Sequence, residues 1–221
     1  MIKTEHLATA SAPDGKLMSL YRRQDVYSIR VGGVELMTTN QSYSEERLGE
    51  LVCDKWSGND TEILIGGLGF GFTLGAVLKS ISKSSRVVVA ELMESVIMWN
   101  SNKEYQLCHR LMSDSRTFIR QKDVMDVIKE KPGNFHGIIL DVDNGPEALT
   151  TGGNQNLYSL DGLMTIRGAL KKRGVLGVWS ADNSQQFQKM MRKAGFDVEV
   201  HKVRSRGHKG SLYHLFIGQL K

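Results

Sequence analysis

The sequence predicts an α/β protein with a doubly wound, mostly parallel sheet and a small N-terminal β segment. Three features predict it: buried-strand runs that alternate with helical spacing, a glycine-rich turn after the first of these runs, and a carboxylate at the end of the second. The chain has 221 residues, of which 40% are hydrophobic, enough for one full-sized α/β domain with an appendage.

Composition argues against several classes of protein. Cys53 and Cys108 lie far apart without a Cys-x-x-Cys spacing, so neither a disulfide framework nor a zinc site is indicated, and we expect no metal. No apolar run approaches the roughly 18 residues of a membrane span, and residues 1–6 lack the apolar core of a signal peptide. We therefore expect a cytoplasmic protein with no membrane partner.

The net charge is +5, and its basic residues gather at 171–173 and at 202–209. A positive field of this kind suits an anionic substrate or RNA. Such a cluster is more often the solvated tip of a hairpin. We do not expect a nucleic-acid partner, because this basic cluster is the only feature that supports one.

The N-terminal part predicts a β-hairpin appendage, 1–43. Residues 1–16 form a polar lead, and the alternation over 17–31 and 34–37 predicts short antiparallel strands. Ser44 is expected to cap a helix that runs to about Lys55. The main α/β domain is placed at 44–221, and a homodimer is expected because short exposed strands need covering.

The apolar run 63–65 predicts the first buried strand, and 72–78 has helical spacing. The glycines between them lack Cβ atoms, so a ligand can approach the main-chain N–H groups at the start of the helix. About twenty residues on, the run 86–91 predicts a second strand that ends in Glu91. A carboxylate there can accept hydrogen bonds from a ribose diol, although a packing turn and a solvated strand end explain the same residues.

The next elements continue the alternation. Helical spacing covers 94–102 and 104–112, and 116–120 predicts a third strand. Asp123 follows it, where its carboxylate suits either an adenine amino group or the N-cap of a helix over 124–131. These two interpretations are equally supported.

A fourth strand, 135–141, ends in a group of acids that comprises Asp141, Asp143 and Glu147, with Asn144 between them. Acids crowded at a strand tip are unfavourable unless a cation or a proton occupies the site, which favours function. Turn chemistry is the alternative. Beyond a polar loop at 150–156, the pattern predicts helices at 157–170 and 184–194, a strand at 174–180 and a closing antiparallel pair at 196–203 and 211–219.

Taken together, the segments 65–71, 87–91, 122–124 and 138–141 resemble the seven-stranded class I fold of S-adenosylmethionine-dependent transferases. Within that class the chain resembles spermidine and spermine synthases, from about Leu17 to its end, with a Tyr-x-Glu stretch at Tyr43-Ser-Glu45. The resemblance implies that the glycine loop cradles the nucleoside, that Glu91 holds the ribose, and that Asp141 orients or deprotonates an attacking amine. The implied site is, for catalysis, Asp141 and Asp143; for the nucleoside, Gly66, Gly67, Leu68, Gly69, Gly71, Glu91, Leu92, Asp123 and Val124; and for the acceptor, Tyr43, Glu45, Asn144, Glu147 and Tyr158.

Gly69 departs from this family, whose glycine loop usually carries an aspartate that contacts the amino end of decarboxylated S-adenosylmethionine. Its absence removes a repulsion against the α-carboxylate of ordinary S-adenosylmethionine. The resemblance implies aminopropyl transfer to a small-molecule amine, from a decarboxylated donor, and Gly69 keeps methyl transfer from the ordinary donor as the alternative. A non-catalytic binder of adenosyl nucleosides or RNA is the alternative from another class. An NAD-dependent oxidoreductase is disfavoured, because the glycines are out of register with Gly-x-Gly-x-x-Gly.

Overall fold

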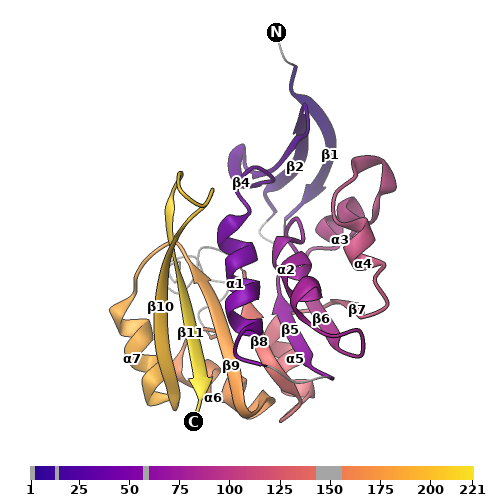
Figure 1. The fold of residues 1–221 in the computed structure, drawn as a ribbon. Helices are drawn as coiled ribbons and strands as arrows, with labels where there is room; N and C mark the ends of the chain where they lie inside the picture. Colours follow the sequence, from indigo (N-terminus) through magenta and orange to yellow (C-terminus); the bar gives the residue numbers. More distant parts are fainter. Residues whose placement is uncertain (1–2, 13–14, 57–59, 143–155) are drawn as a thin grey trace.

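The computed structural model describes residues 3–12, 15–56, 60–142 and 156–221, and contains two sheets (Figure 1). The smaller is a four-stranded antiparallel sheet in chain order. Its strands are β1 (Glu5–Ser11), β2 (Leu17–Arg23), β3 (Val26–Val31) and β4 (Val34–Thr38).

The N-terminal polar lead was predicted wrongly, since β1 pairs antiparallel with β2 from Glu5 to Ser11. Leu7, Ala8 and Ala10 are partly buried against the core. Two of these three are alanines, which have little strand preference and small apolar surface, so the strand leaves a weak sequence signal. The division of the chain at residue 43 stays a prediction.

The larger sheet has seven strands in the order β10-β11-β9-β8-β5-β6-β7. Strands β9, β8, β5, β6 and β7 are parallel, whereas β11 pairs antiparallel with both β9 and β10. The predicted doubly wound, mostly parallel sheet is thereby confirmed. Its strands are β5 (Glu62–Gly66), β6 (Arg86–Glu91), β7 (Thr117–Gln121), β8 (Phe135–Leu140), β9 (Leu170–Ser180), β10 (Phe196–Arg204) and β11 (Leu212–Leu220).

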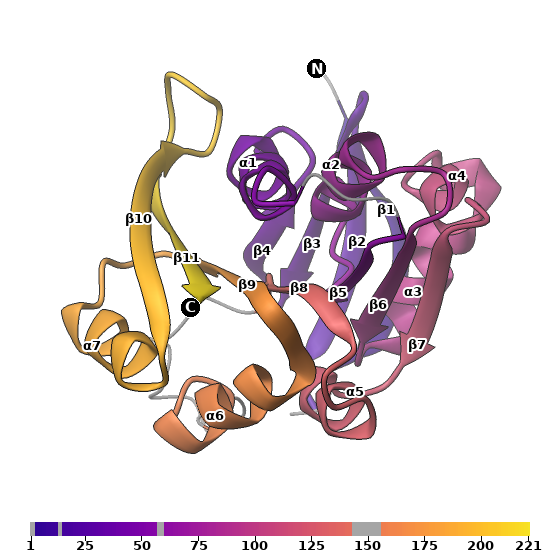
Figure 2. The ribbon, with the colours of Figure 1, turned by 60° about the horizontal axis from the view of Figure 1, so that its bottom comes forward.

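Helices cover both faces of this sheet (Figure 2). One buried apolar cluster joins the sheet to α1, α2, α3 and the N-terminal sheet, and a second joins it to α5, α6 and α7. The sheet is therefore buried on both sides, which explains its continuous apolar runs. The helices are α1 (Tyr43–Cys53), α2 (Phe72–Ser80), α3 (Glu94–Ser101), η1 (Lys103–Tyr105), α4 (His109–Met112), α5 (Val124–Glu130), α6 (Leu160–Ala169) and α7 (Gln185–Lys193).

Two helix predictions need correction. The helix expected at 104–112 is interrupted, because Gln106 has a φ of 53° and separates η1 from α4. Helix α1 begins one residue before the expected cap, Ser44, which is buried inside the helix. The free N–H of Tyr43 donates instead to the carbonyl of Ser205, 3.3 Å away, so a distant segment supplies an acceptor for this helix end.

Candidate active site

The carboxyl ends of β5, β6 and β8 meet at one edge of the sheet. The register pairs Gly66 with Ala90 on one side and with Leu140 on the other, so the residues that follow each strand lie side by side. Backbone hydrogen bonds continue past the strands, from the Gly67 amide to the Ala90 carbonyl and from the Asp141 amide to the Gly66 carbonyl, both 2.9 Å. This edge is where open α/β sheets bind ligands.

The glycine loop between β5 and α2 needs two of its glycines for steric reasons. Gly67 has a φ of 90°, and a Cβ atom there would lie 2.4 Å from the Asp141 carbonyl oxygen. Gly71 has a φ of 80°, and its Cβ would lie 2.6 Å from the Cβ of Cys108. Side chains at either position would push the loop away from β8 or from α4.

Glu91 closes this loop from the end of β6. One of its carboxylate oxygens, Oε2, accepts from the Leu68 amide and the other, Oε1, accepts from the Met93 amide, each at 2.8 Å. Burial raises the pKa of Glu91, and these backbone donors act in the opposite direction. Each oxygen can accept a further hydrogen bond, so the ribose-binding role of Glu91 is compatible with this geometry and stays a prediction.

The other nucleoside-binding candidates lie around the loop. Asp123 Oδ1 accepts from the Met125 amide at 2.7 Å, so its carboxylate caps α5. This is the N-cap role, one of the two interpretations that the sequence left open for Asp123. Val124 is buried beneath the loop, where its Cγ2 would be 2.8 Å from a Cβ on Gly66. Leu92 is 55% exposed and lines a cavity of about 360 Å³ next to β1 and α3.

A pair of half-buried carboxyl groups lies on the other side of the loop. Asp141, directly after β8, accepts a hydrogen bond through Oδ2 from the Thr73 hydroxyl at 2.6 Å. Burial raises the pKa of Asp141 to about 6. Burial first, and then the charge of Asp141, raises the pKa of Glu45 on α1 to about 7. Within the part of the chain that the structure describes, neither carboxyl group has an ion-pair partner.

The two tyrosines predicted at the acceptor side occupy different environments. Tyr43 is 43% exposed at the start of α1, and its ring faces Gly207 on the turn between β10 and β11. Tyr158 is 1% exposed in the core and donates from its hydroxyl to the Val142 carbonyl at 3.2 Å. The structure thus brings Glu45 beside Asp141, whereas Tyr158 supports the backbone after Asp141 from the core. The remaining candidates, Asp143, Asn144 and Glu147, lie outside the described residues.

Sequence reasoning missed two residues that hold the loop. Thr73, in the first turn of α2, donates to Asp141, and Asn100 on α3 donates from its amide to the Gly69 carbonyl at 2.8 Å. The position of Thr73 two residues after the last glycine of the loop is a usable signal, because the first turn of this helix faces the strand ends. Asn100 has none, since its contact depends on how α3 packs.

In the described ranges no group of three or more potential metal ligands is found, and no helix is long and apolar enough to cross a membrane. No family model matches the sequence, and neither does any curated protein.

Solved structures do match. Spermidine synthase in complex with the transition state analogue AdoDATO superposes with a TM-score of 0.77 at 18% identity, over 98% of this chain and 72% of that one. Spermidine synthase from Thermotoga maritima gives a TM-score of 0.78 at 18% identity, over 98% and 73%. A probable spermidine synthase from Corynebacterium glutamicum gives 0.67 at 17% identity, over 97% and 79%. The chain therefore has a spermidine-synthase-like fold. The superposition covers nearly the whole chain, so the likeness includes the smaller N-terminal sheet.

Proposed function

We propose that this protein is an alkyl-group transferase that binds a sulfonium nucleoside of the S-adenosylmethionine type and transfers an aminopropyl group to a small-molecule amine. The observation that carries the proposal is the pair Glu45 and Asp141, two half-buried carboxyl groups that lack a cationic partner in the described residues, beside a glycine loop at the mouth of the sheet. Acids of raised pKa in such a place are typical of functional sites.

The donor is assigned to the half of the mouth formed by β5, β6 and β7. The glycine loop would hold the nucleoside through its N–H groups, Glu91 would take the ribose hydroxyls, and Asp123 with Val124 would flank the adenine. The cavity beside Leu92 leaves space next to the end of β6. The similarity in fold to a spermidine synthase bound to AdoDATO supports this assignment.

The acceptor is assigned to the acid pair. An aliphatic amine titrates near 10 and is mostly a cation at neutral pH. At that pH the pair is partly protonated, because its raised pKa values lie at about 6 and about 7. An arriving ammonium group replaces this proton as the compensating charge, so the amine is bound and oriented by the same groups that then deprotonate it.

The reaction itself needs alignment above all. The lone pair of the deprotonated nitrogen attacks the carbon next to the sulfonium sulfur, the C–S bond breaks with its electrons going to sulfur, and a neutral thioether leaves. The proton from nitrogen passes to Asp141. The Thr73 hydrogen bond fixes the orientation of that carboxylate toward the loop.

Methyl transfer from ordinary S-adenosylmethionine is the second candidate, and Gly69 favours it. A Cβ atom on Gly69 would meet only Met37 Sδ, at 3.7 Å, so this point of the loop has room for a donor carboxylate. A non-catalytic nucleoside or RNA binder is the third candidate.

Calorimetry and a product assay test these alternatives. We expect decarboxylated S-adenosylmethionine to bind more tightly than the ordinary donor, and mass spectrometry to detect an aminopropylated amine. Tighter binding of the ordinary donor together with a methylated product would select methyl transfer. Binding without any product would select the non-catalytic candidate, and RNA binding would weaken steeply with salt.

A homodimer is part of the proposal. Val34 and Leu36 on β4 are 73% and 50% exposed, and β4 is an edge strand of its sheet. Edge strands with exposed apolar residues favour association. Sedimentation equilibrium at micromolar concentration would give twice the monomer mass, and a single monomeric species would refute this part.

A further inference from the structure

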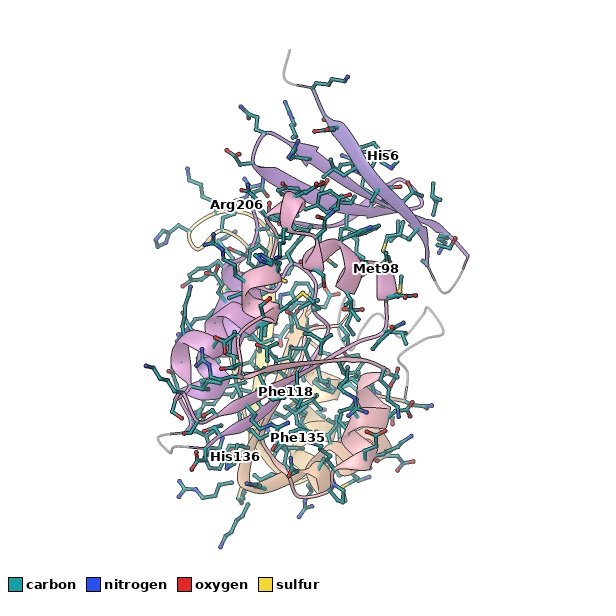
Figure 3. The ribbon with its side chains drawn as sticks, turned by 90° about the vertical axis from the view of Figure 1, so that its right-hand side faces the viewer. His6, Met98, Phe118, Phe135, His136 and Arg206 are labelled. Atoms are coloured by element: carbon teal, nitrogen blue, oxygen red, sulfur yellow. The ribbon has the colours of Figure 1, made fainter. Side chains whose placement is uncertain are left out.

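The turn between β10 and β11 lies on the acceptor side of the site. In the sheet order, the donor strands β5, β6 and β7 lie at one end and β9, β11 and β10 at the other, with β8 and Asp141 between them. In Figure 3, Arg206 on this turn lies in the same half of the molecule as His6 of the N-terminal sheet, whereas His136 lies near the opposite end. The turn is therefore at the edge where the site is formed.

Three contacts fix the turn to the start of α1. The Tyr43 amide donates to the Ser205 carbonyl at 3.3 Å, and Arg206 Nη2 donates to Asn40 Oδ1 at 3.3 Å. The Tyr43 ring packs against Gly207, where a Cβ atom would lie 3.8 Å from the ring. Glu45 follows Tyr43 by two positions on the same helix. The turn is thus attached to the element that carries Glu45, one of the two half-buried acids.

The turn is strongly cationic and has no acidic neighbour in sequence. The last acid in the chain is Glu199. After it, four exposed cations on or beside the turn have no ion-pair partner in the described part of the chain: Lys202, Arg204, Arg206 and Lys209. Arg204 donates only to a neutral group, the Gly210 carbonyl at 3.0 Å. A positive field this uncompensated attracts anions.

Buried polar atoms without a partner also gather at this edge. Ser205 is fully buried, yet its hydroxyl has no hydrogen-bond partner, and the same holds for Trp179 Nε1 and for His214 Nδ1. The register pairs His214 with Ser180, the last residue of β9, and Leu215 with Trp179. The strand ends beside the turn therefore carry unused hydrogen-bonding capacity.

We infer that the acceptor of this enzyme is an amine that also carries an anionic group, a carboxylate or a phosphate, with the amine at Glu45 and Asp141 and the anion at Arg204 and Arg206. The inference rests on the proposed function and narrows its substrate class. A simple diamine has the opposite charge pattern, because its second ammonium group would approach four cations. An acceptor with opposite charges at its two ends satisfies both the acid pair and the turn.

Three acceptors of similar length test the inference: 1,4-diaminobutane, 4-aminobutanoate and 3-aminopropyl phosphate. We expect an anion-bearing amine to exceed the diamine in kcat/KM by about tenfold or more, as expected for one close charge contact. Comparison of the carboxylate with the phosphate identifies the anion. A diamine that is the best of the three would overturn the inference.

Variants identify the residues that act. Arg206→Ala and Arg204→Ala should each raise KM for the anionic acceptor by about tenfold with little change in kcat, and use of the diamine should rise. Arg206→Lys, which keeps the charge, should restore part of the loss. Lys172→Ala, a cation that lines a separate cavity with Arg167 and Lys221, is the matched control and should behave as the parent protein. Equal KM values in all variants would refute the role of the turn.

Nucleoside binding separates the inference from the proposed function. Calorimetry with the sulfonium donor should give the same affinity for the parent protein and for Arg206→Ala. A parent protein that binds no donor would refute the proposed function itself. A parent protein that binds the donor and alkylates diamines best would leave the proposed function standing and would refute only the anionic acceptor. The anionic acceptor would also be refuted by a turn that binds RNA in a salt-dependent manner without selecting among the amines.

Discussion

The two halves of the candidate site differ in how their polar groups are satisfied. In the donor half, Glu91 accepts from the amides of Leu68 and Met93, and the Gly69 carbonyl accepts from Asn100. In the acceptor half, Glu45 and Asp141 are half-buried without a cation in the described residues, and the cations at the β10–β11 turn lack acids. The donor half is preorganised by its own hydrogen bonds, whereas the acceptor half holds separated charges that a ligand would compensate.

The largest effect is expected in the acceptor half, from Asp141→Asn. The amide keeps an oxygen that can accept from Thr73, but it cannot take a proton from the amine. Transfer should fall by about 10²- to 10⁴-fold, the range for loss of a general base, while nucleoside affinity stays within a few fold. Steady-state kinetics and calorimetry on the same sample measure both. Glu46→Gln, on the residue of α1 that follows Glu45, is the control and should keep the turnover of the parent protein. Unchanged turnover in Asp141→Asn would contradict the catalytic role proposed for the acceptor half.

Glu91→Ala should produce the next largest effect, confined to the donor half. The amides of Leu68 and Met93 would lose their acceptor, and a buried unpaired donor costs about 1–3 kcal/mol. Nucleoside affinity should fall by about 10- to 100-fold, and the free energy of unfolding should decrease as well. Calorimetry and urea unfolding check the two results. The exposed Glu104→Ala, outside the cavity beside Leu92, serves as control, and full retention of affinity by Glu91→Ala would mean that the nucleoside binds elsewhere.

Gly69→Asp tests the choice of donor. The backbone there is left-handed, with a φ of 50°, which Asp adopts more readily than most residues, and the nearest atom to the new Cβ is Met37 Sδ at 3.7 Å. The added carboxylate should favour decarboxylated over ordinary S-adenosylmethionine by about tenfold. Gly69→Asn has nearly the same shape without the charge and should leave the ratio of the two affinities unchanged. Equal ratios for Asp and Asn would show that this position does not face the donor.

The smallest effect concerns the dependence of stability on pH. Both acids have a pKa that burial raises in the folded protein, to about 7 for Glu45 and about 6 for Asp141. Below about pH 4 folded and unfolded chains both hold these protons, so the pair carries no penalty there. As pH rises from about 4 to about 7 only the unfolded chain releases them freely, so this pair lowers the free energy of unfolding progressively, and the full penalty remains above pH 7.

Glu45→Gln should therefore flatten this decrease, which urea unfolding between pH 4 and 8 measures. Glu50→Gln, on an exposed residue of the same helix, should keep the slope of the parent protein. A parent protein whose stability shows no contribution from Glu45 in this window would contradict the burial of the pair.

The sequence could predict that Glu91 lies beside the glycine loop, but it could not predict from local pattern that Glu45 lies beside Asp141, and the reason is physical. The glycine loop and Glu91 belong to one βαβ unit, where spacing along the chain fixes spacing in the fold. Glu45 was identified as a site residue only through the family resemblance, because its partial burial depends on the packing of α1 against α2. The contact between Tyr43 and Ser205 joins residues far apart in the chain, and no local pattern predicts it. Strand β1 was missed for a related reason, since its alanines gain their partial burial only from the assembled core.

A crystal structure with a bound sulfonium nucleoside tests the central claim most directly. We expect the ribose hydroxyls within hydrogen-bonding distance of Glu91 and the sulfur directed across the glycine loop toward Asp141. A nucleoside bound away from the carboxyl ends of β5 and β6, or one whose sulfur points away from Asp141, would contradict the account.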